Sequence, residues 1–162
     1  MDWQHIPYIV PAIATFILSV GLAFYSWRRR HMPGAIPLMW LALAVSLWTA
    51  GRALEWMSTD TATGFFWGKV QYLGVVVIPV AWLACVLQYL GKEEWLTKRN
   101  LTLLTIVPSI TLLLAWTNEH HGLIWREFNP VTHVPVKYGP VFWVNLIYGY
   151  SLIGVGVLLL LM

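Results

Sequence analysis

Charged residues are scarce in this sequence of 162 residues. Only 10% of the residues are charged, whereas 59% are hydrophobic. A soluble domain carries about 25% charged residues, so this composition excludes an ordinary water-soluble domain. The net charge is a modest +3 and no basic stripe runs along any segment, so nothing predicts nucleic-acid binding. We therefore expect the lipid bilayer to be part of the solvent of this protein.

Cysteines and recognisable catalytic motifs are also lacking. The single cysteine, Cys85, excludes an internal disulfide bond. The sequence contains neither a Gly-rich phosphate loop nor a His-Glu-x-x-His motif, so we expect no enzymatic activity and no cofactor in this segment. Four of its five long apolar runs lack a mid-depth acidic residue. That absence argues against an ion pump or a proton-coupled transporter built from these runs alone.

Five apolar runs are long enough to cross a bilayer, which needs about 20 mostly apolar residues per helix. The 11 tryptophans and 7 tyrosines fit this interpretation, because amphipathic rings collect at membrane interfaces. We predict an all-α polytopic membrane protein. Its transmembrane helices are expected at residues 8–27, 35–57, 64–90, 101–117 and 140–162.

Basic residues predict the orientation of these helices. Arg28, Arg29 and Arg30 follow the first run, and a second basic group follows the third run, so both loops are expected in the cytoplasm. The N-terminus and the segment 118–139 are then expected outside. The fifth run is still apolar at Met162, and we expect further spans and an output domain to be absent from this chain.

Two local features qualify the helical prediction. Pro79 and Pro108 lie in the middle of the third and fourth runs, where a proline kinks a helix or frees a backbone carbonyl. Kinks of this kind are also common in membrane helices without any special role. In the segment 118–139, alternating β-branched residues around Asn129-Pro130 predict a short β-hairpin in an extracellular loop.

The strongest candidate for a binding site is the stretch 46–72, where charge meets aromatic rings. Arg52 and Glu55 lie three residues apart and share one helix face, with Trp48 and Trp56 on or near it. This face can bind a ligand carboxylate or amine, or the Arg52–Glu55 pair can simply satisfy itself at the interface. In the next helix, Lys69 and Tyr72 are predicted to share a face at the same depth, and Gln71 to point elsewhere. Tyr72 and Gln71 are the better candidates for ligand contact in this helix.

The histidine-rich segment 118–139 could serve several purposes. His120, His121 and His133 suggest metal binding or pH sensing, but their spacing does not match a closed structural metal site and no cysteine joins them. We therefore assign no metal. The preferred interpretation is that Asn118 caps the fourth helix or binds the loop, with one histidine at the interface.

Short motifs in a particular order point to a family. They include Leu54-Glu55, Tyr72-Leu73-Gly74, Pro79 with Trp82, Thr117-Asn118, and Gly139-Pro140 with Phe142-Trp143. Together the sequence resembles the seven-transmembrane N-terminal sensor region of bacterial and archaeal histidine kinases, from about residue 9 to the end. The resemblance implies a seven-helix sensor bundle, of which this chain holds five helices. The catalytic part of such a kinase would lie beyond this segment.

On this basis we expect the input module of a two-component sensor histidine kinase in the inner (cytoplasmic) membrane. The expected partners are the lipid bilayer, an unidentified small ligand in an outward-facing pocket, and a second copy bound through the full-length protein. Two alternatives stay open, namely a transporter or channel fragment and a non-sensing anchor or dimerisation module. The expected ligand-binding residues are Trp48, Arg52, Glu55, Trp56, Lys69, Tyr72, Asn118, His121 and Trp125.

Overall fold

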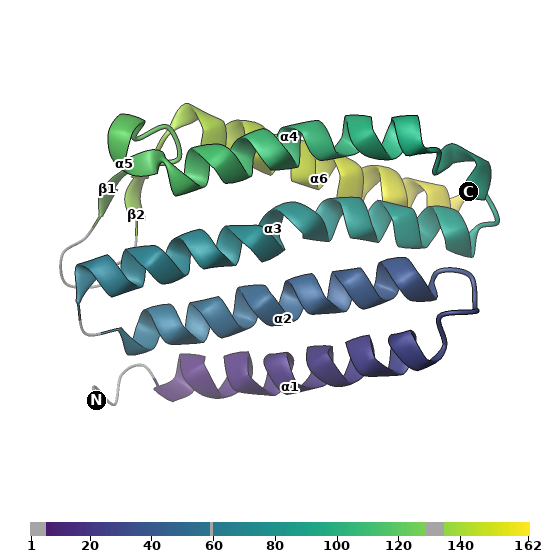
Figure 1. Cartoon of the computed structure of the whole chain (residues 1–162), viewed down its shortest axis with the longest axis horizontal. Helices are drawn as coiled ribbons and strands as arrows, with labels where there is room; N and C mark the ends of the chain where they lie inside the picture. The colour runs from purple at the N-terminus through teal and green to yellow at the C-terminus, as the bar shows by residue number, and fades with distance from the viewer. Residues whose placement is uncertain (1–5, 59, 129–134) are drawn as a thin grey trace.

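Five long helices make up most of the chain. A computed structural model describes residues 6–58, 60–128 and 135–162 (Figure 1). All five helices are long and apolar enough to cross a membrane, so the chain is a multi-pass membrane protein. The helices are α1 (Ile6–Arg28), α2 (Ala35–Met57), α3 (Thr61–Tyr89), α4 (Lys98–Trp116) and α6 (Pro140–Leu161).

Helix starts differ most from the sequence prediction. α2 has the predicted bounds, but α3 begins at Thr61 rather than at residue 64, and α4 begins at Lys98 rather than at residue 101. Both earlier starts have a polar cap. The Asp60 carboxylate accepts a hydrogen bond from the backbone N–H of Thr63, and the Thr97 hydroxyl accepts one from the N–H of Asn100. Hydropathy alone does not register these caps, because their residues are polar.

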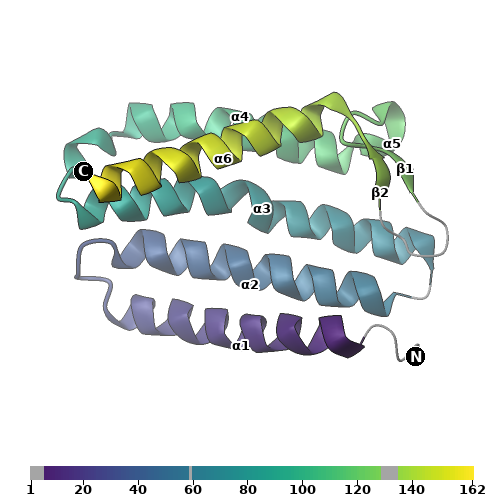
Figure 2. The same ribbon diagram turned by 180° about the vertical axis from the view of Figure 1, so that it is seen from behind.

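α3 is the central helix of the bundle. α1, α2 and α3 lie side by side, and α4 and α6 pack on the opposite side of α3 from α2 (Figures 1 and 2). Half of the most apolar stretch of α3 is buried in the protein, compared with 6% of that of α6. α3 therefore carries most of the interhelical packing, whereas few residues of α6 are fully buried.

The bundle has two distinct ends (Figure 1). One, called here the strand end, holds the turn between α2 and α3 together with α5 (Asn118–His121), β1 (Trp125–Phe128) and β2 (Pro135–Tyr138). The other, called here the basic end, holds the α1–α2 loop with its arginines and the α3–α4 loop with the short helix η2 (Glu93–Trp95). The basic end corresponds to the side predicted to face the cytoplasm.

β1 and β2 pair antiparallel within the segment where strands were predicted. Trp125 lies opposite Tyr138, and Glu127 lies opposite Lys137 with a salt bridge of 2.8 Å between Nζ and Oε1. The predicted turn at Asn129-Pro130 lies outside the described residues. The strands place Trp125 and Tyr138 at the strand end, where both line the site described below.

Pro108 frees a backbone carbonyl, one of the two outcomes predicted for it. Proline has no N–H, so the carbonyl of Leu104, four residues earlier, loses its helical partner. The Tyr148 hydroxyl of α6 donates a hydrogen bond to this carbonyl at 2.6 Å. The proline in α4 thus creates an acceptor that a neighbouring helix uses, and the bond ties α4 to α6.

Close contacts between helices rest on glycines in α3 and α6. A Cβ added at Gly74 would collide with the carbonyl oxygen of Ala44, so α2 and α3 could not approach as they do. A Cβ at Gly156 would likewise collide with the Trp82 indole, whose Nε1 donates to the carbonyl of Ile153 at 3.3 Å. Small residues therefore set the spacing of α3 against α2 and α6.

Candidate functional site

A cavity of about 170 Å³ opens between α2, α3, the strands and the start of α6. It lies toward the strand end and combines aromatic rings with three polar side chains. We call it the aromatic cavity. Its walls are formed by Trp48, Arg52, Glu55, Gly64, Phe65, Gly68, Gln71, Tyr72, Val75, Trp125, Tyr138 and Phe142.

The α2 wall follows from helical spacing. Trp48, Arg52 and Glu55 are separated by four and three residues, so all three side chains lie on one face of the helix. The Arg52 guanidinium donates from Nη1 to Glu55 Oε2 at 2.9 Å. Its carbon lies 5.1 Å from the centre of the Trp56 ring, so the cation also rests on an aromatic face.

Gln71 completes this polar group from α3. Its Nε2 donates to Glu55 Oε2 at 2.6 Å, and both side chains are only 6% exposed. The expectation that Lys69 shares a face with Tyr72 while Gln71 points elsewhere is wrong, because Gln71 lines the cavity with Tyr72 and Lys69 does not. Residues on a helix face recur every three or four positions, and Gln71 continues the face of Gly64 and Gly68, which also line the cavity.

The α3 wall is open where its glycines lie. A Cβ added at Gly68 would meet no atom within 4 Å, although the residue lines the cavity. Tyr72 and Val75 continue the same wall toward the middle of the helix. The missing side chain at Gly68 therefore helps to make the space that a ligand would occupy.

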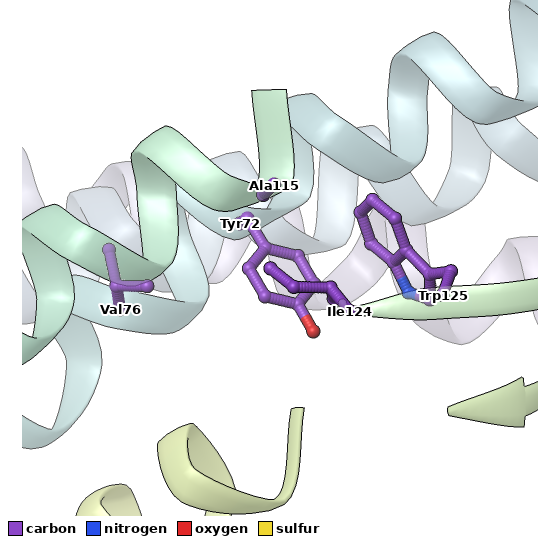
Figure 3. Close-up of a cluster of buried hydrophobic side chains, with 5 residues drawn as sticks. All are labelled: Tyr72, Val76, Ala115, Ile124 and Trp125. Carbon is purple, nitrogen blue, oxygen red and sulfur yellow. The ribbon is translucent and has the colours of Figure 1, made fainter. Parts of the chain in front are cut away.

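The opposite wall is supplied by the segment after α4, which folds back into the bundle. Ile124 is fully buried and Trp125 nearly so, and both pack with Tyr72, Val76 and Ala115 in one hydrophobic cluster (Figure 3). The Trp125 ring meets the Tyr72 ring edge-on, with centroids 4.9 Å apart. The strand thus presses an aromatic side chain against the central helix.

Asn118 holds this segment in place. Its Oδ1 accepts hydrogen bonds from the N–H groups of Ile124 and Trp125 at 2.9 and 3.1 Å, and its Nδ2 donates to the carbonyl of Trp125 at 2.9 Å. Because Asn118 is buried, these bonds satisfy backbone groups that water cannot reach. The interpretation of Asn118 as a residue that binds the loop is confirmed.

Gly139 also holds the segment 122–125 in place, through its backbone. Its N–H donates to the carbonyl of Ile124 at 2.8 Å, and a Cβ at this position would collide with the carbonyl of Leu123. The backbone just after β2 therefore lies directly against residues 123–124. This contact places Tyr138 and Phe142, whose rings stack with centroids 3.9 Å apart, at the cavity wall.

Lys69 points away from the aromatic cavity. It is 8% exposed, and its Nζ donates to the carbonyl of Trp116 at 3.2 Å and to Glu119 Oε1 at 2.7 Å. Its Nζ also lies 4.8 Å from the centre of the Phe65 ring. A cation at the end of α4 suits the negative end of the helix dipole, so Lys69 joins α3 to α4 and α5.

The Lys69–Glu119 pair shifts the ionisation of the exposed carboxylate. The hydrogen bond and the charge of Lys69 hold the pKa of Glu119 below its usual value, with a smaller contribution in the same direction from His120. Glu119 lies in α5, outside the five spanning helices. The strand end therefore carries a local electrostatic contact that acid weakens.

His120 and His121 take surface positions, and His121 also binds the backbone. His121 Nδ1 accepts a hydrogen bond from the N–H of Leu123 at 3.1 Å, and Nε2 lies 3.0 Å from the Thr117 hydroxyl. His120 is exposed, and His133 lies outside the described residues. Across residues 6–58, 60–128 and 135–162, no three His, Cys, Asp or Glu side chains are grouped to hold a metal ion.

Five of the nine expected ligand residues line the aromatic cavity, namely Trp48, Arg52, Glu55, Tyr72 and Trp125. The other four, Trp56, Lys69, Asn118 and His121, support its surroundings instead. The cavity is also lined by Gln71, a candidate that the final set of nine left out, and by Phe65, Tyr138 and Phe142, which the sequence did not suggest. The helix face running from Gly64 through Gly68 to Gln71 would have indicated the glutamine, but nothing local placed the strand and α6 residues beside it.

One known protein is similar in sequence over a large part of this chain. It is an apolipoprotein N-acyltransferase from Geobacter metallireducens (strain ATCC 53774 / DSM 7210 / GS-15), 26% identical over 152 residues. The match covers 89% of this chain but 26% of the acyltransferase, so the chain spans about a quarter of that protein. No solved structure matches the chain.

A family model gives the broader result. The model described as the N-terminal 7TM region of histidine kinase matches residues 11–162, which is nearly the whole chain. The match includes all five long helices and the strands, apart from the first residues of α1. The chain belongs to the family of N-terminal 7TM regions of histidine kinases.

Proposed function

We propose that this chain is the ligand-sensing input module of a two-component sensor histidine kinase, with the aromatic cavity as its binding site. The observation that carries the proposal is the cavity itself. It places the buried Glu55–Gln71 contact next to an open wall at Gly68, among aromatic rings from five separate elements. A site built from elements distant in sequence can report a ligand by changing how those elements pack.

The position of α3 supports transmission of a signal. α3 lines the cavity near the strand end and contacts α2, α4 and α6. If the strand end faces outside, as the basic residues predict, a ligand arriving from outside would reach the helix that organises the bundle. An output domain attached beyond α6 would then sense a change in helix packing. Ligand binding alters this equilibrium only if the two states differ in affinity.

A cavity-filling substitution tests the proposal without knowledge of the ligand. Gly68→Leu places a side chain into the open space of the cavity, whereas Gly21→Leu places the same side chain on open surface of α1. The full-length gene product, with either change, would be reconstituted in nanodiscs and its autophosphorylation rate measured. We expect Gly68→Leu to change the rate at least fivefold and Gly21→Leu to leave it within twofold.

The same experiment separates the proposal from its rivals. A folded Gly68→Leu protein with the wild-type phosphorylation rate would overturn the sensing role of this cavity and favour a membrane anchor. A solute flux across liposomes that depends on the chain would favour a transporter or channel fragment. Thermal unfolding of each variant in the same nanodiscs verifies that a changed rate does not reflect loss of structure.

A further inference from the structure

The polar group at the aromatic cavity has unused hydrogen-bonding capacity. Glu55 is almost fully buried, yet both of its hydrogen bonds, from Arg52 and Gln71, reach the same oxygen, Oε2. Oε1 accepts a hydrogen bond from none of the described residues. Oε1 also keeps some accessible surface. Among the described residues, the one side-chain polar atom that has neither a hydrogen-bond partner nor accessible surface is Ser26 Oγ, so Glu55 Oε1 is not fully enclosed. A carboxylate oxygen is thus available at the cavity wall.

Arg52 has hydrogen-bond donors that Glu55 does not use. Its guanidinium carries five N–H donors, and Nη1 is the nitrogen that binds Glu55. The side chain is 37% exposed and rests on the Trp56 ring, which leaves the edge of the guanidinium plane accessible. Such an edge matches the geometry of a carboxylate, to which arginine can donate two parallel bonds.

The remaining walls suit a small apolar group. Trp48, Phe65, Tyr72 and Phe142 surround the space beside the polar group, and Gly68 adds no side chain to it. The volume is about 170 Å³. An apolar cavity of about 150 Å³ is enough to hold benzene, so the space fits one ring or branched chain rather than a large ligand.

Charge balance decides between the ligands that these groups could hold. Arg52 and Glu55 cancel each other, so a simple amine or a simple acid would add an uncompensated charge to a partly buried site. A ligand with one positive and one negative group leaves the site neutral. Its ammonium can donate to Oε1 of Glu55 while its carboxylate accepts from Arg52.

We infer that the aromatic cavity binds a small zwitterion with an apolar side chain, the chemistry of a hydrophobic α-amino acid. The ammonium group binds Glu55, the carboxylate binds Arg52, and the side chain packs between the aromatic walls. This inference rests on the proposed sensing function, because it names the ligand class of the same cavity. It requires no covalent step, and binding alone delivers the signal.

A matched set of probes tests the ligand class. L-phenylalanine, phenethylamine and 3-phenylpropanoate share one ring and differ in which charged group they keep, and L-leucine tests a branched chain. Binding to the full-length protein in nanodiscs would be followed by calorimetry and by tryptophan fluorescence, since Trp48 and Trp125 line the cavity. We expect at least one amino acid to bind, and its amine and acid analogues to bind at least tenfold more weakly.

Conservative variants assign the two ends of the ligand. Glu55→Gln keeps the shape of the side chain and removes its charge, and Arg52→Gln removes the carboxylate partner. Each should weaken amino acid binding at least tenfold. Glu127→Gln is the matched control, because Glu127 pairs with Lys137 on the strands and does not line the cavity. It should leave the affinity unchanged.

The outcomes separate this inference from the proposed function. If phenethylamine or 3-phenylpropanoate binds wild-type protein as tightly as L-phenylalanine, or if folded Glu55→Gln binds unchanged, the zwitterion inference is overturned. Absence of binding by both amino acids overturns it too. In each case the proposed sensing role still depends on whether Gly68→Leu changes autophosphorylation. A null result for Gly68→Leu counts against the sensing role itself.

Discussion

Glu55 and Lys69 are both buried ionisable side chains near the strand end, but their surroundings differ. Lys69, between α3 and α4, donates to a backbone carbonyl and a carboxylate and also contacts the Phe65 ring. Glu55, between α2 and α3, concentrates two bonds on one oxygen and leaves the other for the cavity. A buried charge whose contacts all go to neighbouring elements stabilises a junction, whereas one with a polar atom left at a cavity wall can also bind a ligand.

The comparison extends to the backbone on each side. On the α4 side of α3, Asn118 of α5 satisfies three backbone groups of residues 124 and 125. At the α2–α3 junction, Gly51 and Gly74 allow close approach, and the polar contact is made by side chains alone. We therefore expect the first junction to be stiff, and under the proposed function a ligand would act on the second.

We expect the largest loss of stability from a substitution at Asn118. Asn118→Ala removes the acceptor for two buried N–H groups and the donor to one carbonyl, and each unsatisfied buried group costs about 1–3 kcal/mol. We expect a loss of about 3 kcal/mol in the free energy of unfolding, measured by denaturant titration in detergent micelles. Asn118→Asp keeps an acceptor and should lose less. Equal stability of Asn118→Ala and wild type would contradict the stiff junction.

Lys69 should come next. Lys69→Met keeps an apolar stem but removes the hydrogen bonds to Trp116 at the end of α4 and to Glu119 of α5. Bonds to charged groups are worth about 1.5–3 kcal/mol. We expect a loss of about 2 kcal/mol in unfolding free energy without loss of amino acid binding. The control is Lys137→Met, because its exposed pair with Glu127 should be worth less than about 1 kcal/mol. Reduced ligand affinity in Lys69→Met would place this residue at the site after all.

Tyr148 provides a smaller effect at the α4–α6 contact. Tyr148→Phe deletes the donor to the carbonyl that Pro108 leaves without a helical partner. A hydrogen bond between membrane helices contributes about 1 kcal/mol, so a destabilisation of about that size is expected. Tyr150→Phe, at an exposed position on the same helix, should show no change. A double variant with Pro108→Ala should recover stability, because the helix then supplies its own donor.

The smallest effect is a pH dependence of the stiff junction. The pKa of Glu119 is lowered by Lys69, so the pair stabilises the fold above the usual carboxyl pKa of 4.5 and loses this contribution as pH falls through the lower folded value. Melting temperature should therefore fall more steeply below pH 4.5 in wild type than in Lys69→Met. Identical acid profiles for the two proteins would show that the pair does not contribute.

The polar part of the site could be predicted from local sequence, and the aromatic part could not. Arg52, Glu55 and Trp48 share a helix face by spacing alone, and the structure keeps them together at one cavity. Lys69 was assigned to that cavity because it lies at the same depth. Depth in the membrane does not fix the direction in which a side chain leaves its helix. Lys69 and Gln71 are two residues apart and so point to different sides of α3, Lys69 toward Glu119 and Gln71 toward Glu55.

Contributions from distant segments were beyond local reasoning. Trp125 reaches Tyr72 because Asn118 folds residues 122–125 back into the bundle, and Tyr138 follows because Gly139 lets the two backbones touch. Strand character in the segment was visible from its alternating residues. The sequence did not show which side chain of the strands would contact α3. That contact depends on hydrogen bonds between residues that are not related by any periodic pattern.

By itself, the sequence determined the five membrane helices, the basic and aromatic residues at their ends, and the presence of charge beside tryptophan at residues 48–56. These properties follow from the cost of placing polar groups in hydrocarbon, which acts on each segment separately. Only the tertiary structure decided that Glu55 of α2 binds Gln71 of the central helix α3, while Lys69 of α3 binds Glu119 of α5. Partner choice among buried polar groups depends on helix rotation and packing, and both are properties of the assembled bundle.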